Sequence, residues 1–184
     1  MYQPPEPPDE MLTCFDEQGN LIEPHTRKDI HEKPLRFWHG VVNIWMVNKR
    51  GELLCTKRSE NLGGNPGKWQ TYLGGHVKEG KSFKEAAVME LDEEVGLEIN
   101  PDKLFLVEKG KKDEPKHFFE SYAYRFDGHL NELKFNDGEI VEAKWLSMDE
   151  YNQDKETYPE RWCNSCSLES QEIIKMWLSS LDLN

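Results

Sequence analysis

The segment GGHVKEGKSFKEAAVMELDEEVGLEI, residues 74–99, carries the start and stop signals of one well-bounded helix. Ser82 and Glu85 have the spacing of a capping box, in which the serine hydroxyl accepts an orphan N–H at the helix start. Gly96 stands where a residue with left-handed backbone ends a helix. The segment therefore predicts a helix over residues 83–95, around which the rest of the fold must be arranged.

Three glutamates of this helix lie beside its apolar stripe and not opposite it. Glu90, Glu93 and Glu94 are related by steps of three and four residues and fall within an arc of roughly 100°. Like charges at this spacing repel, and anions near a helix C-terminus oppose its dipole. A solvated acidic surface explains this placement poorly. Carboxylate oxygens on one rigid face suit a divalent cation such as Mg²⁺ or Mn²⁺. The stripe consists of Phe83, Ala87, Leu91 and Val95.

Residues 75–97 match seven of the nine specified positions of the Nudix box, G-x5-E-x7-R-E-U-x-E-E-x-G-U, where U is aliphatic. The chain resembles a Nudix hydrolase on this motif, and the likeness extends over about residues 37–151. The flanking segments GELLCTKRS, NPGKWQTYLGGHV and GEIVEAKWLSMDEY also look like those of the family. The matching box residues are Gly75, Glu90, Leu91, Glu93, Glu94, Gly96 and Leu97.

Two positions depart from the motif. Lys81 stands where the family usually has the first glutamate, and Met89 stands where it has arginine. In the family that arginine commonly orients the neighbouring glutamate, here Glu90. Losses of this kind around metal ligands typically cost 10–100-fold in affinity or activity. A Nudix-fold protein that binds its ligand without turnover therefore stays open as an alternative.

The resemblance implies the α/β fold of the family, an α/β/α sandwich with a mixed β-sheet. Alternating apolar segments predict a strand, a turn at Glu17–Asn20 and a second strand near the N-terminus, then a long hairpin turning at Asn48–Gly51. Residues 167–181 predict an amphipathic helix that packs on the sheet. Further strands are expected in KLFLVEK, HFFESYAYRF and IVEAKWLS. We expect a disordered Pro-rich and acidic tail over 1–9, a β-hairpin extension over 10–36, and the Nudix domain with its C-terminal helix over 37–184.

The formal net charge of −12 argues against DNA and anionic membranes as partners. No apolar run approaches the roughly 18 residues of a membrane span, and MYQPPEPPDE lacks the apolar core of a signal peptide. We therefore expect a cytoplasmic protein, with a homodimer as an open alternative for its oligomeric state.

The four cysteines do not form a disulfide framework. Cys14 and Cys55 occur in strand-like apolar surroundings and are expected to be core residues. Cys163 and Cys166 have C-x-x-C spacing, but the sequence has no second ligand pair of comparable spacing for a zinc site, although His117 and His129 could be recruited in space; we assign the pair no function.

The expected reaction is hydrolysis of the diphosphate linkage in a nucleoside diphosphate joined to another group. The helix glutamates and, by resemblance, the Gly74 carbonyl would bind Mg²⁺ or Mn²⁺, which lowers the pKa of a bound water. Glu139 matches an acidic position that supplies a ligand or base in some members, although a solvated strand-edge glutamate is an open alternative. Lys57 and Arg58 are candidates to clamp a phosphate, or surface residues. Trp69 and Tyr72 are candidates to stack on a base, or core residues.

The N-terminal part is also similar to the isopentenyl-diphosphate isomerase-like branch of the fold. There, histidines before the first core strand and one after the glycine pair bind a metal; His31, His39 and His76 occupy similar positions. Glu120 is a candidate acid for proton transfer. The isomerase uses a cysteine in the segment before its Gly-Gly-His, and here WQTYLGGHV has none. This disfavours isomerase activity.

Overall fold

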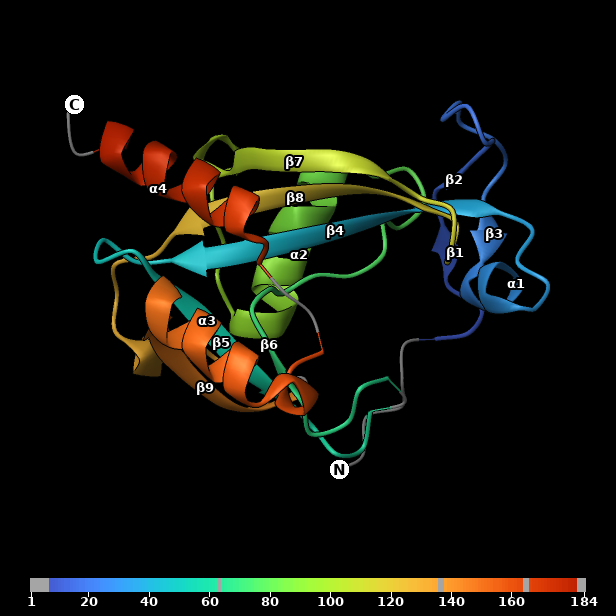
Figure 1. The fold of residues 1–184 in the computed structure, drawn as a ribbon. Helices are drawn as coiled ribbons and strands as arrows, with labels where there is room; N and C mark the ends of the chain where they lie inside the picture. Colours follow the sequence, from blue (N-terminus) through green and yellow to red (C-terminus); the bar gives the residue numbers. More distant parts are fainter. Residues whose placement is uncertain (1–6, 63, 136–137, 164–165, 182–184) are drawn as a thin grey trace.

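A mixed β-sheet forms the middle layer of the computed structural model, which describes residues 7–62, 64–135, 138–163 and 166–181 (Figure 1). Its strands run in the order β6-β5-β4-β8-β7, with β2 added beside β4 and β9 beside β5. The central pair β4–β8 is parallel, whereas the other pairs are antiparallel. The strands are β2 (Cys14–Phe15), β4 (Trp38–Val47), β5 (Glu52–Arg58), β6 (Trp69–Gln70), β7 (Phe105–Lys112), β8 (His117–Arg125) and β9 (Ile140–Ser147).

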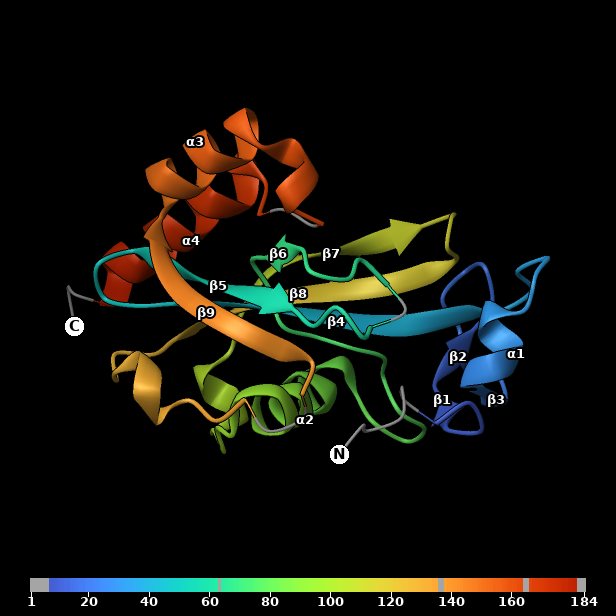
Figure 2. The ribbon, with the colours of Figure 1, turned by 90° about the horizontal axis from the view of Figure 1, so that it is seen from below.

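Helices cover both faces of this sheet. Helix α2 (Phe83–Val95) lies on one face, and α3 (Met148–Thr157) and α4 (Leu168–Leu181) lie on the other (Figure 2). The predicted α/β/α sandwich with a mixed sheet is therefore confirmed. Short 3-10 helices occupy three connections: η1 (Pro101–Lys103), η2 (Leu130–Glu132) and η3 (Pro159–Arg161).

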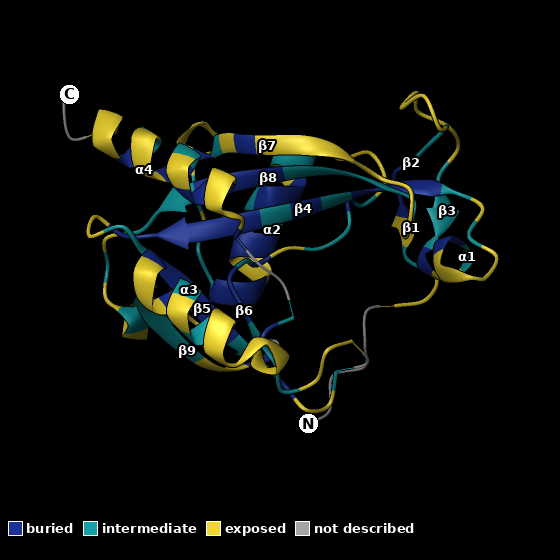
Figure 3. Ribbon diagram, viewed as in Figure 1, coloured by how far each residue is buried: buried dark blue, intermediate teal, exposed yellow. Residues whose placement is uncertain are grey.

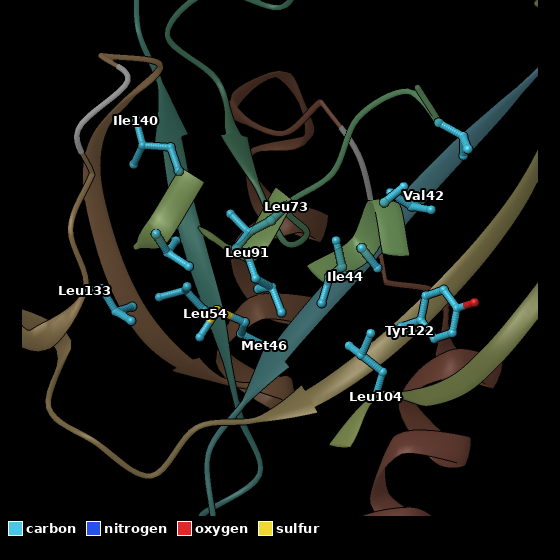
Figure 4. Packing of buried hydrophobic residues seen from close by; sticks show 14 residues of the cluster. Val42, Ile44, Met46, Leu54, Leu73, Leu91, Leu104, Tyr122, Leu133 and Ile140 are labelled. Atoms are coloured by element: carbon cyan, nitrogen blue, oxygen red, sulfur yellow. The ribbon is translucent and has the colours of Figure 1, made fainter. Parts of the chain in front are cut away.

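Helix α2 has the predicted bounds and the predicted caps. The Ser82 hydroxyl accepts the Glu85 N–H, the Glu85 carboxylate accepts the Ser82 N–H, and Gly96 ends the helix with a φ of 69°. Its apolar face packs against β4, where Leu91 joins Ile44 and other buried side chains in one cluster (Figure 4). Because this cluster is fully buried, the helix has one rotational setting about its axis. The glutamates beside the stripe are fixed by the same packing.

The opposite face of the sheet is covered by α3 and α4. Both helices show exposed outer surfaces, whereas β4 and β5 beneath them are largely buried (Figure 3). Tyr151 from α3 and Ile174 from α4 are fully buried in the second apolar cluster. The sequence predicted α4 but not α3, whose polar composition gives almost no apolar stripe. A capping box between Ser147 and Glu150 was the signal available for it.

The N-terminal extension differs in part from the predicted hairpin. The turn is present, because the Asp16 carboxylate accepts N–H groups of Gln18 and Asn20. The segments before and after it pair as predicted: β1 (Met11–Leu12) and β3 (His25–Thr26) form a two-stranded antiparallel sheet of their own, and Phe15 bridges Leu21. The difference is that β2, which also precedes the turn, pairs with β4 of the main sheet. A short helix, α1 (Arg27–His31), follows. The extension is therefore joined to the main sheet; residues 1–6 of the predicted tail lie outside the described residues.

Candidate active site

The glycine pair before α2 runs against the central strand. Val42 donates its N–H to the Gly75 carbonyl across 2.9 Å, and Ile44 and Leu73 exchange hydrogen bonds of 2.8 and 3.0 Å. A Cβ at position 74 would lie 2.1 Å from the Val42 carbonyl oxygen, and Gly74 has a φ of 150°. Only glycine permits this close approach. The approach fixes the backbone of the Gly-Gly segment next to α2.

Two helix glutamates meet the glycine pair. The Gly74 N–H donates to Glu94 Oε1 across 2.6 Å. Glu90 Oε1 lies 2.3 Å from the point that a Cβ of residue 75 would occupy, so the absence of a side chain there makes room for the carboxylate. Both glutamates are only 8% exposed. The sequence placed them at the edge of the buried face, and the structure confirms that placement.

The third glutamate is bound by a lysine. Lys78 Nζ donates to both carboxylate oxygens of Glu93, at 2.9 and 3.2 Å, and lies 3.6 Å from Glu10 Oε1. Burial opposes the charged form of Lys78, but the hydrogen bond to Glu93 and the charges of Glu93 and Glu10 raise its pKa above the usual value. Lys78 is therefore a cation at neutral pH. The side chain of Glu93 remains 49% exposed.

A cavity of about 210 Å³ brings five of the predicted residues together. It lies beside Glu94 at the end of β5. Its volume is below the roughly 300–1,000 Å³ of sites that enclose drug-sized ligands. Such a space admits a phosphate group and leaves the rest of a larger substrate outside. The lining consists of Arg58, Gly64, Asn65, Gln70, Tyr72, Gly74, Glu94, Glu139 and Cys163.

Arg58 contributes the positive charge of this lining. Its Nε donates to the Gly64 carbonyl at 3.0 Å and its Nη1 to Gln70 Oε1 at 3.1 Å. The register between β5 and β9 shifts between Lys57 and Arg58, and such irregularities commonly redirect a side chain at a site. The neighbouring Lys57 is not part of the lining. Of the two predicted phosphate-binding residues, the cavity thus contains one.

The aromatic candidates separate in the same way. Both rings pack against the second apolar cluster, but of the two only Tyr72 also lines the cavity. The centroid of the Trp69 ring lies 6.2 Å from that of Trp162. The Lys144 amine lies 4.2 Å from the centre of the Trp69 ring. This environment corresponds to the core alternative for Trp69.

Cys163 is a cavity residue that the sequence did not indicate. Its thiol donates to the Trp69 carbonyl across 3.4 Å, and burial raises the pKa of the thiol. Burial also raises the pKa of Cys166, to about 12. Both thiols are therefore protonated at neutral pH. No local pattern could have found Cys163, because a bridge between Trp69 and Trp162 brings distant segments together.

The donor set fits a hard divalent cation. Carboxylates of Glu90 and Glu94 are partly enclosed beside the Gly-Gly segment, and oxygen ligands of this kind suit Mg²⁺ and Mn²⁺. Within the described part of the chain, no three His, Cys, Asp or Glu side chains converge closely enough to hold a metal as they stand. Glu93 is engaged with Lys78, so its participation as a ligand requires the release of that ion pair.

A cluster of histidines lies at the start of β4, where His76, directly after the glycine pair, bridges Val41. The rings of His31, His39 and His76 have centroids 5.1 to 5.6 Å apart, and His117 lies 5.9 Å from His39. Burial lowers the pKa of His39 to about 3 and that of His76 to about 2. Arg27 Nη1 lies 2.7 Å from His76 Nδ1. The histidines named by the isomerase resemblance therefore lie together and are neutral at pH 7.

Comparison with known proteins agrees with this fold. The Nudix domain family model matches residues 38–163, so the chain belongs to the Nudix family. An uncharacterised Nudix hydrolase of Clostridium acetobutylicum is 28% identical over 151 residues, which are 77% of this chain and 72% of that protein. Isopentenyl-diphosphate Delta-isomerase of Paenarthrobacter aurescens is 27% identical over 146 residues, covering 75% and 76%.

The structural comparison supports the fold alone. A crystal structure of a Deinococcus radiodurans protein superimposes with a TM-score of 0.67 at 22% identity, covering 91% of this chain and 98% of that one. Among the described residues, no helix has the length and apolar character needed to cross a bilayer.

Proposed function

We propose that this protein is a divalent-metal-dependent hydrolase that cleaves the diphosphate linkage of a nucleoside diphosphate joined to another group. The observation that carries the proposal is the shared cavity, in which Glu94, Gly74 and Glu139 face the same space as Arg58. Nudix hydrolases generally use Mg²⁺ or Mn²⁺, and the oxygen donors here suit either ion. The substrate is a small molecule, and the net charge of −12 disfavours nucleic acid and anionic membranes as partners.

Each residue has a role that its position supports. Glu90, Glu94 and the Gly74 carbonyl would hold the metal, and Glu93 would join them once Lys78 releases it. When bound, the ion neutralises phosphate charge and lowers the pKa of a water.

The remaining lining residues act on the substrate. The Arg58 guanidinium, already oriented by Gly64 and Gln70, binds a non-bridging phosphate oxygen. Glu139 accepts the proton of the attacking water or adds an oxygen ligand, the bridging oxygen leaves on the second phosphate group, and Tyr72 lies against the base of the nucleoside.

A substrate panel tests this proposal. Nucleoside triphosphates, nucleoside diphosphate sugars, ADP-ribose and dinucleotides are incubated with the protein, with and without Mg²⁺ or Mn²⁺, and phosphate-containing products are quantified. We expect metal-dependent turnover of at least one diphosphate-linked compound. Saturable binding of a compound without product, in both metals, would instead identify a non-catalytic Nudix-fold binding protein.

A second candidate, isopentenyl-diphosphate isomerase activity, is favoured by the histidine cluster. His31, His39 and His76 lie together as that resemblance implies, and the Tyr122 hydroxyl donates to the Glu120 carboxylate nearby on β8. The missing thiol weighs against it, because residues 69–77 contain no cysteine. Cys163 reaches the cavity but remains protonated at neutral pH. Incubation with isopentenyl diphosphate, followed for the allylic isomer, separates this activity from hydrolysis.

A further inference from the structure

Lys78 stands between two carboxylates from different parts of the chain. Its Nζ lies 2.9 Å from Glu93 Oε1 on α2 and 3.6 Å from Glu10 Oε1 in the N-terminal extension. The Glu10 carboxylate is itself held by the Arg27 guanidinium at 2.5 Å. The lysine thus has one partner in the candidate metal site and a second partner outside it.

Hydrogen bonds hold the backbone of Lys78 in place, and its side chain reaches two carboxylates. Its carbonyl accepts the Thr13 hydroxyl at 2.9 Å and the Lys81 N–H at 3.1 Å, and it bridges Leu12 of β1. Its side chain is 31% exposed, and the ammonium lies 2.9 Å from Glu93 Oε1 and 3.6 Å from Glu10 Oε1. Because both carboxylates are already within reach, an exchange between them needs no movement of the backbone.

A divalent cation and Lys78 compete for the same atoms. The ammonium donates to both oxygens of Glu93, at 2.9 and 3.2 Å, and these are the oxygens that a metal ion would bind. Without a cation, Glu90, Glu93 and Glu94 would repel one another across one helix face. Met89 brings no positive charge to this face. Lys78 supplies that charge from the neighbouring loop.

We propose that Lys78 is the resident counter-ion of the metal-free site, and that a divalent cation displaces it from Glu93 toward Glu10. The inference rests on the proposed function, because it assumes that the carboxylates bind metal. It makes Lys78 a positioning residue, and it gives the N-terminal extension a part in metal binding through Glu10. Bound metal and a Glu93-bound ammonium exclude each other, so the lysine lowers the apparent metal affinity.

Metal titration of the whole protein tests this exchange. The protein is freed of metal with a chelator, and Mn²⁺ is titrated while free Mn²⁺ is followed by electron paramagnetic resonance. We expect Lys78→Met to bind Mn²⁺ on the order of tenfold more tightly, because a unit positive charge beside a dication is removed. Glu10→Gln should bind Mn²⁺ several-fold more weakly, since the displaced ammonium loses its second partner. Lys78→Arg should remain close to the parent.

Lys84→Met is the matched control. It removes the same charge from the first turn of α2, where Lys84 lies 3.7 Å from Asp102, and should leave the Mn²⁺ affinity unchanged. Melting scans without metal add a second readout: Lys78→Met should melt lower than the parent and gain more from Mn²⁺. This readout does not depend on turnover.

The outcomes separate the two proposals. If the parent binds Mn²⁺ and Lys78→Met binds it equally or more weakly, the counter-ion role is wrong and the hydrolase proposal stands. If Lys78→Met does not fold, Glu10→Gln decides, because unchanged or tighter binding in that variant also overturns the exchange. If the parent binds no Mn²⁺, the proposed metal-dependent hydrolase activity is wrong, and so is the counter-ion role of Lys78.

Discussion

Glu94 Oε1 accepts the backbone N–H of Gly74 across 2.6 Å, and this bond joins α2 to the segment that runs along β4. One carboxylate oxygen of a buried glutamate therefore fixes the loop. The residue has a structural task in addition to its expected task as a metal ligand. Substitutions at position 94 must be designed so that the two tasks can be told apart.

Glu94→Gln makes that separation. The amide oxygen can still accept the Gly74 N–H, so we expect a folded protein whose melting temperature is close to that of the parent. Turnover should fall by two or more orders of magnitude, because a neutral amide is a poor ligand for a hard cation. Steady-state kinetics on the best substrate of the panel measures the loss. Glu98→Gln, at an exposed position, is the control. Equal turnover in the two variants would show that Glu94 is not needed for catalysis.

Metal should stabilise the protein. Mg²⁺ or Mn²⁺ at one hundred times its dissociation constant adds about 2.7 kcal/mol to the free energy of unfolding. For a chain of this size the melting temperature should rise by roughly 5–10 °C. Differential scanning calorimetry with and without metal gives the value, and the rise should disappear in a Glu90→Gln, Glu94→Gln double variant. An unchanged melting temperature at millimolar metal would contradict the predicted site.

Gly75→Ala should damage the site without a large change in backbone. The added methyl would lie 2.3 Å from Glu90 Oε1, so the carboxylate must move. We expect a 10–100-fold weaker metal affinity, the range typical when the support of a ligand is lost. Gly80→Ala is the control for stability, because its φ of 73° strains an alanine although no atom lies within 4 Å of the new methyl. Weaker metal binding in both variants would show a general loss of stability.

Arg58→Lys should raise KM more than it changes kcat. Lysine keeps the charge but cannot bind Gly64, Gln70 and a phosphate at once with a planar fork. We expect KM to rise roughly tenfold, equivalent to about 1.4 kcal/mol of lost binding. Arg50→Lys, in the distant turn where Arg50 pairs with Glu52, makes the same substitution away from the cavity. The two variants should differ in KM if Arg58 binds phosphate.

The free energy of unfolding should decline on mild acidification, because the half-buried His117 is held neutral in the folded protein. Burial lowers the pKa of His117 to about 4, whereas an unfolded histidine titrates near pH 6.5. Between these values the unfolded state binds a proton that the folded state does not. The free energy of unfolding therefore falls as pH drops from about 6.5 toward 4.

Unfolding by urea at several pH values measures this slope. His117→Gln should make the slope shallower, whereas exposed His129→Gln should leave it unchanged. Equal slopes in the parent and His117→Gln would show that His117 is not held neutral.

Local signals accounted for the elements that the sequence predicted well. The caps at Ser82 and Gly96 set both ends of α2, and the turn at Asn48–Gly51 joins β4 to β5 as predicted. The predicted hairpin is short, however, because β4 and β5 are register partners only at Val47 and Leu53 and β4 pairs along its length with β8. Helix α3 was missed because its stabilising contacts come through single residues such as Tyr151, with no stripe along its length.

Only the part of the candidate site that lies on a single helix, α2, could be predicted from the sequence. The spacing of Glu90, Glu93 and Glu94 indicates a shared face. It does not indicate that Lys78, from the preceding loop, forms an ion pair with Glu93. The separation of Arg58 from Lys57 depends on a register shift opposite β9, and the place of Cys163 depends on a bridge between distant segments. These are tertiary relationships without a local signature.

The parallel pairing of β4 with β8 has a consequence for how the site assembles. Asn43 and Ser121 are register partners, yet 78 residues separate them along the chain. The Gly-Gly segment and α2 both lie within this long loop and both rest on β4. Closing so long a loop is slow, since its entropy is lost before the contacts form. During synthesis the whole box therefore leaves the ribosome before β8 does, and Glu139, which follows β8 in the sequence, joins the cavity after both.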